Sequence, residues 1–135
     1  MAKRDKPLVR PLSPFWQYQI WPSMFLSILH RITGVAMSIG AVLLVYWLTA
    51  AAMGPDQYAT AQTIFACWIT QVALIGFIFS FCYHLLNGIR HLVWDTGHGF
   101  DLAVARTSSY VVIVGAVVLT AVLIALFFAR AGGAA

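Results

Sequence analysis

Charged residues are scarce in this sequence. Only 9% of its 135 residues are Asp, Glu, Lys or Arg, whereas 61% are hydrophobic. Soluble domains carry roughly 25% charged residues, so this chain has too few polar groups to cover a soluble surface. The mean hydropathy of +0.86 points the same way. The composition therefore excludes an ordinary soluble domain and predicts a single membrane domain over residues 1–135.

Cysteine is also rare, and the net charge is small. Cys67 and Cys82 lie in an apolar run without CxxC spacing, so we predict buried free thiols and neither a disulfide nor a zinc site. The formal charge of +4 sits beside apolar runs, where basic residues usually set membrane topology, and this argues against nucleic acid as a partner. We find neither a signal peptide nor a long Arg- and Ser-rich presequence, which favours a bacterial chain.

Uncharged stretches separate the few charges. They run between Arg31 and Asp56, between Asp56 and Arg90, and between Arg106 and Arg130. Each exceeds the ~20 apolar residues that a helix needs to cross the bilayer, and none alternates like the strand of a barrel. We predict an all-α fold with three transmembrane helices near residues 29–52, 63–94 and 108–129. Residues 53–56 should end the first helix, and the second, at ~45 Å, should tilt or protrude.

Lysine and arginine flank these spans unevenly. Residues 53–62 carry none, two border the second loop and four precede the first span, namely Lys3, Arg4, Lys6 and Arg10. By the positive-inside rule, the N-terminal segment 1–28 and the second loop lie in the cytoplasm, and the first loop and the C-terminus lie outside. The expected location is the inner membrane of a bacterium.

All four histidines fall on the cytoplasmic side in this topology. His30 begins the first span, His84 and His91 lie near the end of the second, and His98 lies in the following loop. Ionisable groups within spans are costly, so each is a candidate functional residue. His98 is expected to be solvated. Arg90, His91 and Asp95 form either a proton route or a structural ion pair, and we favour the ion pair.

His84 lies deepest of the four. It is six residues, or ~9 Å, further into the span than Arg90, on a face that also carries Gly76, Ser80 and Gly88. Small residues on that face let another helix or a flat macrocycle approach the backbone, and a neutral imidazole in a helix bundle can bind haem iron. His84 is therefore either a haem ligand or a buried histidine hydrogen-bonded to a neighbouring helix.

A second polar face lies at the start of the first span. Ser27, His30 and Arg31 place a hydroxyl, an imidazole and a guanidinium on one side of the helix at the membrane surface. Haem propionates are anionic and pair with such groups, and a quinone carbonyl needs a hydrogen-bond donor. The alternative is a topology-setting basic anchor with a helix-capping serine.

Three segments resemble the cytochrome b subunit of succinate dehydrogenase, a membrane anchor of respiratory complex II. They are residues 10–14 (RPLSP), 27–34 (SILHRITG) and 84–97 (HLLNGIRHLVWDTG). Many relatives have a histidine where this chain has Phe15, which leaves the N-terminal segment without an assigned role. Two other readings remain open: a fumarate reductase anchor that oxidises menaquinol, and a cofactor-free scaffold or transporter.

The resemblance implies a function in electron transport and the tricarboxylic acid cycle. It implies that haem b is shared with a second small anchor subunit and that His84 is the axial iron ligand. It places His30 and Arg31 near the haem propionates, and Ser27 and Arg31 at the ubiquinone site. Such an anchor contributes no catalytic residue of its own. The implied partners are the second anchor, an iron–sulfur subunit and a flavoprotein subunit that oxidises succinate.

Overall fold

The structure, a computed structural model, describes residues 22–132. The RPLSP segment, Phe15 and the four N-terminal basic residues lie outside the described residues. Four helices follow in order: α1 Pro22–Met53, α2 Pro55–Ala66, α3 Trp68–Asp95 and α4 Leu102–Gly132. Three of them, over Met24–Met53, Trp68–Asp95 and Leu102–Arg130, are long and apolar enough to cross a membrane. No strand occurs in the described part, so the predicted all-α fold with three apolar helices is confirmed.

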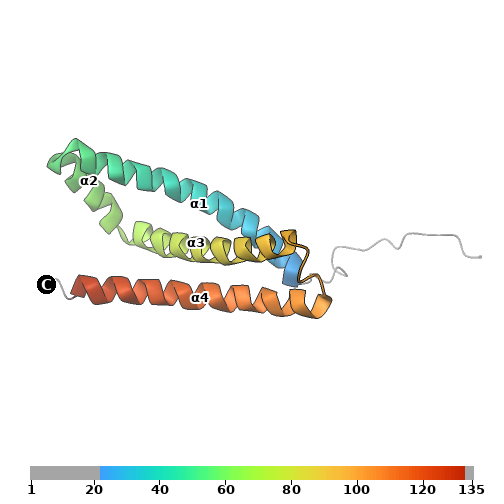
Figure 1. The fold of residues 1–135 in the computed structure, drawn as a ribbon. Coiled ribbons are helices and arrows are strands. Elements are labelled where there is room, and N and C mark those ends of the chain that lie inside the picture. The colour runs from blue at the N-terminus through green and yellow to red at the C-terminus, as the bar shows by residue number, and fades with distance from the viewer. Residues whose placement is uncertain (1–21, 133–135) are drawn as a thin grey trace, which may run out of the picture.

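Helix α3 lies between α1 and α4 (Figure 1). It runs beside α4 over most of its length, whereas α1 meets it at one end and diverges toward the other, where the short α2 closes the gap. A cavity of about 720 Å³ lies in the divergent half, lined mainly by apolar side chains of α1, α2 and α3. The closely packed end is the end that carries the histidines.

Helix α1 begins earlier than predicted, at Pro22 rather than near residue 29. Proline suits the first helical turn because its φ is already helical and its missing N–H needs no partner there. The additional turns bring Leu26 into the core, where it is fully buried. Ser27 therefore lies inside the helix, and its alternative interpretation as a helix-capping serine is wrong. Residues 22–28 of the predicted N-terminal segment are helical.

The predicted second span, residues 63–94, is not one helix. Met53 ends α1 as expected, and Gly54 turns the chain with φ 116°, a conformation that glycine adopts at little cost. Pro55 then starts α2 within the predicted loop. The backbone of Cys67 is extended (φ −61°, ψ 134°), and this interrupts the helix between α2 and α3. The break isolates the polar residues of α2 from the apolar span.

Helix α4, which corresponds to the predicted third span, is longer than predicted. It begins at Leu102 rather than near residue 108 and continues to Gly132. The start near residue 108 was predicted because Arg106 ends the charged loop. Arg106 does not interrupt the helix, however, because a long basic side chain can reach water from within a helical turn.

Both cysteines are free, with Cys82 buried and Cys67 exposed at the helix break. The expectation of two buried thiols is therefore wrong for Cys67.

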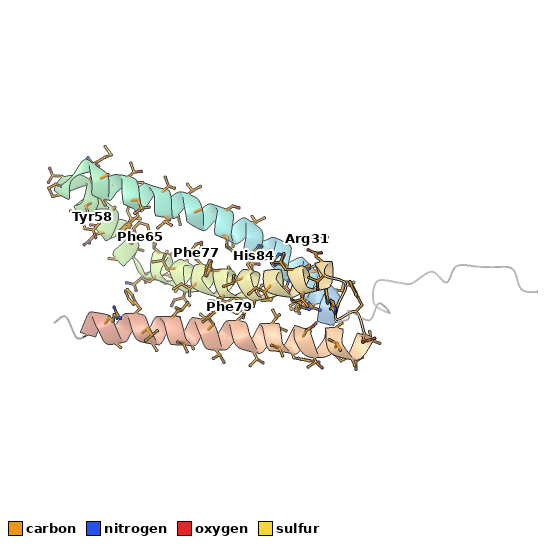
Figure 2. The ribbon with its side chains drawn as sticks, viewed as in Figure 1. Arg31, Tyr58, Phe65, Phe77, Phe79 and His84 are labelled. Atoms are coloured by element: carbon orange, nitrogen blue, oxygen red, sulfur yellow. The ribbon has the colours of Figure 1, made fainter. Side chains whose placement is uncertain are left out.

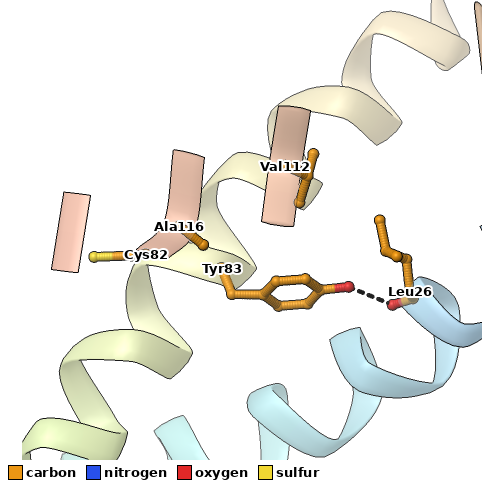
Figure 3. Packing of buried hydrophobic residues seen from close by; sticks show 5 residues of the cluster. All are labelled: Leu26, Cys82, Tyr83, Val112 and Ala116. Atoms are coloured by element: carbon orange, nitrogen blue, oxygen red, sulfur yellow. Dashed lines mark hydrogen bonds between the residues drawn. The ribbon is translucent and has the colours of Figure 1, made fainter. Parts of the chain in front are cut away.

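A small core joins the three long helices at the histidine end. Tyr83 of α3 lies at its centre, and its hydroxyl donates a hydrogen bond of 2.7 Å to the Leu26 carbonyl of α1 (Figure 3). On the other side of α3, Cys82 packs with Val112 and Ala116 of α4. Because this core anchors α3 on both sides, the backbone around residue 84 is fixed relative to α1 and α4.

Candidate functional site

His84 faces helix α1. Figure 2 shows it on α3 toward the same end of the bundle as Arg31. Its Nδ1 lies 3.4 Å from Thr33 Oγ1, and its ring lies over Gly34. The opposite ring nitrogen, Nε2, makes no hydrogen bond within residues 22–132. Of the two sequence-based alternatives, the structure shows the interhelical hydrogen bond, and it also leaves one nitrogen free.

Three histidine rings stack at this end of the molecule. The His30 ring lies 3.7 Å from that of His84, at 14° between planes, and 5.3 Å from that of His91, at 17°. His91 Nδ1 is 2.7 Å from the Asn87 carbonyl oxygen, and Trp94 packs edge-on against its ring. No group of three or more His, Cys, Asp or Glu side chains in the described residues is arranged to hold a metal ion. Stacked faces do not converge their nitrogens on one point.

Ser27 and Arg31 are not part of the histidine stack. Arg31 is exposed and Ser27 is half-buried, and neither side chain makes a hydrogen bond to another described residue. The structure thus brings His30 against His84 but leaves the hydroxyl and the guanidinium unengaged. His98 is exposed and bonded only to neighbouring Thr96, in agreement with its predicted solvation.

Arg90 does not form the ion pair that the sequence suggested. It is 6% exposed and points toward α4, where Nε donates to Ser108 Oγ at 2.9 Å and Nη2 donates to the Ala105 carbonyl at 3.2 Å. Its third hydrogen bond, 3.3 Å from Nη1, goes to Asn87 Oδ1. Asp95 is exposed and is not among its partners, because five residues along a helix is about one and a half turns and faces another side. Arg90 is a link between α3 and α4.

Two buried polar atoms in the described residues have no hydrogen-bond partner. They are His30 Nδ1 and Asn87 Nδ2. Buried polar groups are almost always satisfied, so an orphaned atom requires an explanation. His30 is the central ring of the histidine stack, and Asn87 is buried beside Arg90 on the same helix as His84. Asn87 is fully enclosed by this chain, so only the His30 atom, on a partly buried ring, is a candidate for a partner from outside.

Thr33 and Asn87 are the residues at this site that the sequence did not single out. A threonine inside a helix usually satisfies its hydroxyl on the carbonyl one turn earlier, and nothing in its spacing distinguished Thr33 from that case. Asn87 lies three residues after His84, but the sequence could not show that it is fully buried against Arg90.

Comparison with known proteins relates the chain to one family. Residues 6–123 match the family described as succinate dehydrogenase/fumarate reductase transmembrane subunit. The succinate dehydrogenase cytochrome b556 subunit of Paracoccus denitrificans is 40% identical over 120 residues, which cover 88% of this chain and 92% of the relative. The corresponding subunit of Rickettsia prowazekii is 40% identical over 115 residues, covering 84% and 90%.

A mitochondrial relative extends the similarity. The succinate dehydrogenase cytochrome b560 subunit of Sus scrofa is 34% identical over 110 residues, which cover 78% of this chain and 64% of the relative. Together with the three long apolar helices, the bacterial relatives identify a multi-pass inner-membrane protein. The chain belongs to the succinate dehydrogenase/fumarate reductase transmembrane subunit family, as its three motifs predicted.

Proposed function

We propose that this chain is the cytochrome b anchor of a succinate:ubiquinone oxidoreductase, in which it binds haem b through His84. The observation that carries the proposal is the state of the His84 ring. One nitrogen faces Thr33 and the other is free, on a helix held from both sides by the core. An axial haem ligand requires one uncommitted imidazole nitrogen on a rigid helix.

The residues around His84 fit such a group. His30 Nδ1 has no hydrogen-bond partner among the described residues, so a polar edge such as a propionate would supply the partner that this chain lacks. One turn from His84 on α3, a Cβ added at Gly88 would meet nothing within 4 Å, which leaves room there for a macrocycle or for a helix of a second anchor subunit. Gly76 and Ser80, farther along α3, line the cavity between α1 and α3 instead.

Haem b, when bound, supplies a one-electron carrier next to the quinone site. The chain's own residues bind and orient. His84 would provide a lone pair from Nε2, and His30 and Arg31 would neutralise the propionates as a charge-assisted donor set. His30 is held for this by stacking between the rings of His84 and His91.

Ser27 and Arg31 would serve the quinone. Reduction of a quinone to quinol takes two electrons and two protons, so negative charge develops on a carbonyl oxygen. The Arg31 guanidinium would stabilise that charge and the Ser27 hydroxyl would orient the ring, as preorganised donors do elsewhere. Neither side chain is committed to another described residue, which leaves both available.

The large open surface supports a role inside a complex. Only 6% of the most apolar stretch of α1 and 17% of that of α4 is buried within this chain. The proposed partners are lipid, a second small anchor subunit that would share the haem, an iron–sulfur subunit and a flavoprotein subunit. The soluble subunits would dock on the cytoplasmic side, where the histidines and basic residues gather.

The test of this proposal is optical. His84→Ala should abolish or strongly shift the b-type haem spectrum of the purified complex, because the haem would lose the imidazole proposed to hold its iron. His98→Ala is the matched control, since His98 is exposed in the α3–α4 loop, and it should leave the spectrum intact. An unchanged spectrum in His84→Ala would contradict the ligand assignment.

Two other functions have their own outcomes in the same preparation. The family also contains fumarate reductase subunits, and dependence on menaquinol with fumarate as acceptor would favour that direction of the reaction. A colourless chain that purifies without a flavoprotein would instead indicate a cofactor-free scaffold or transporter.

A further inference from the structure

Thr33 and Gly34 are consecutive residues of α1, and both contact the His84 imidazole. Thr33 is only 3% exposed, and its hydroxyl lies 3.4 Å from His84 Nδ1. A Cβ placed on Gly34 would lie 3.2 Å from His84 Cε1. Nδ1 and Cε1 are adjacent ring atoms, so both contacts hold the same edge of the imidazole toward α1.

The Thr33 hydroxyl has one proton to donate, and its shorter contacts lie within α1. Oγ1 is 2.9 Å from the Leu29 carbonyl oxygen and 3.0 Å from that of His30, compared with 3.4 Å to His84. With its proton directed at these carbonyls, Oγ1 offers His84 a lone pair. In that arrangement the Nδ1–H tautomer of His84 donates to Oγ1, and Nε2 carries the lone pair.

Gly34 sets how closely the ring approaches α1. A contact of 3.2 Å is too short for an ordinary Cβ, so any larger residue would push the His84 ring outward by a few tenths of an ångström. Gly76 on α3 is different, because an added Cβ there meets nothing within 4 Å. The glycine at position 34 is therefore required by the ring it faces.

We propose that Thr33 and Gly34 form a seat on α1 that selects the Nδ1–H tautomer of His84 and fixes its ring plane for iron ligation. They are positioning residues, and the inference rests on the proposed function of His84 as haem ligand. Hydrogen bonds to the outer nitrogen of an iron-binding histidine raise its basicity. An acceptor at Nδ1 therefore favours oxidised iron and lowers the reduction potential of the haem.

The experiment compares Thr33→Val with Thr33→Ser in the purified whole complex. Valine keeps the branched shape and removes the acceptor, whereas serine keeps the acceptor. We expect Thr33→Val to raise the haem midpoint potential in a redox titration and to weaken haem retention about tenfold, measured as haem per flavin under dilution. Thr33→Ser should behave as the parent.

Thr49→Val is the matched control, because Thr49 lies in the same helix and its hydroxyl bonds only the Val45 carbonyl. A Thr33→Val complex with the parental midpoint potential and parental haem retention would contradict the proposal that Thr33 positions His84. So would a Thr33→Ser complex that shifts as much as Thr33→Val.

Gly34→Ala provides an independent measurement should Thr33→Val fail to assemble. The displaced ring should shift the absorption maximum of the haem and lower its retention, whereas Gly76→Ala should leave both unchanged. Identical spectra for the two alanine variants would contradict the proposal. Absence of haem from the parent complex would instead refute His84 as a ligand, so failure of the seat and failure of the proposed function are distinct results.

Discussion

At the scale of single residues, the chemistry of this site depends on which polar atoms are already committed. His84 Nδ1 faces Thr33 while Nε2 is free within residues 22–132, and His30 Nδ1 is buried without a partner. Arg90 is engaged by Ser108 and Ala105 of α4 and by Asn87 of α3. The proposed ligand-binding residues, His84 and His30, therefore have an unpaired ring nitrogen, whereas the nitrogens of Arg90 are used to hold the helices together.

Ser27 offers a direct test at this scale. Ser27→Ala should lower succinate:quinone reductase activity about tenfold, the equivalent of one hydrogen bond of about 1.4 kcal/mol, while succinate oxidation with an artificial electron acceptor continues. Both activities are measured on the same membranes.

Ser38→Ala is the control for the loss of a hydroxyl from α1. Ser38 is exposed and donates only to the Gly34 carbonyl, so neither activity should change. Equal loss of both activities in Ser27→Ala would indicate a role in assembly and not in quinone binding.

At the scale of helices, the close approach of α1 and α3 depends on a glycine. The Phe77 ring of α3 occupies the space where a Gly40 side chain would be. Phe77 and Gly40 also line the cavity of about 720 Å³ between the two helices. Glycine at position 40 thus sets the helix separation beyond the histidine stack.

Gly40→Ala should therefore destabilise the protein by about 1–3 kcal/mol, the usual cost of overpacking. The measurement is thermal unfolding of the purified complex in detergent, where the variant should melt at a lower temperature. Gly76→Ala, which meets no neighbour, should melt at or above the parental temperature. Equal melting temperatures for the two variants would show that Phe77 does not restrain the pair.

At the scale of the whole molecule, the two ends differ. One end carries the histidine stack, Arg31 and Arg90, and the other carries α2, the cavity and the exposed Cys67. The distribution of Lys and Arg assigns the histidine end to the cytoplasm by the positive-inside rule. The orientation is a proposal, and a natural cysteine at the other end allows it to be measured.

A membrane-impermeant thiol reagent should label Cys67 when it is added to the outside of intact cells with permeable outer membranes. Cys82 is buried and should not react, so Cys67→Ser should abolish the signal. His98→Cys, made in that background, should react only in inverted vesicles. Labelling of the position-98 variant from the outside of cells would reverse the assigned orientation.

The sequence alone determined the membrane class, the three apolar helices and the family. These properties depend on local composition: uncharged stretches longer than a bilayer, and short motifs such as residues 27–34 and 84–97. The sequence also identified His84 as a candidate, because an ionisable residue within an apolar helix can be recognised without knowing which face of the helix it occupies.

Tertiary structure decided how these residues face one another. The break at Cys67, the turn of Arg90 toward Ser108, and the contact of Thr33 and Gly34 with His84 all depend on which faces of the helices meet. Several small or polar stripes of this sequence are equally compatible with close packing. The choice among them is set by packing between residues distant in the chain, such as Tyr83 with Leu26 and Phe77 with Gly40. Hydropathy indicates whether a segment prefers lipid or water. Only the packed structure establishes which of its atoms remain free to bind a ligand.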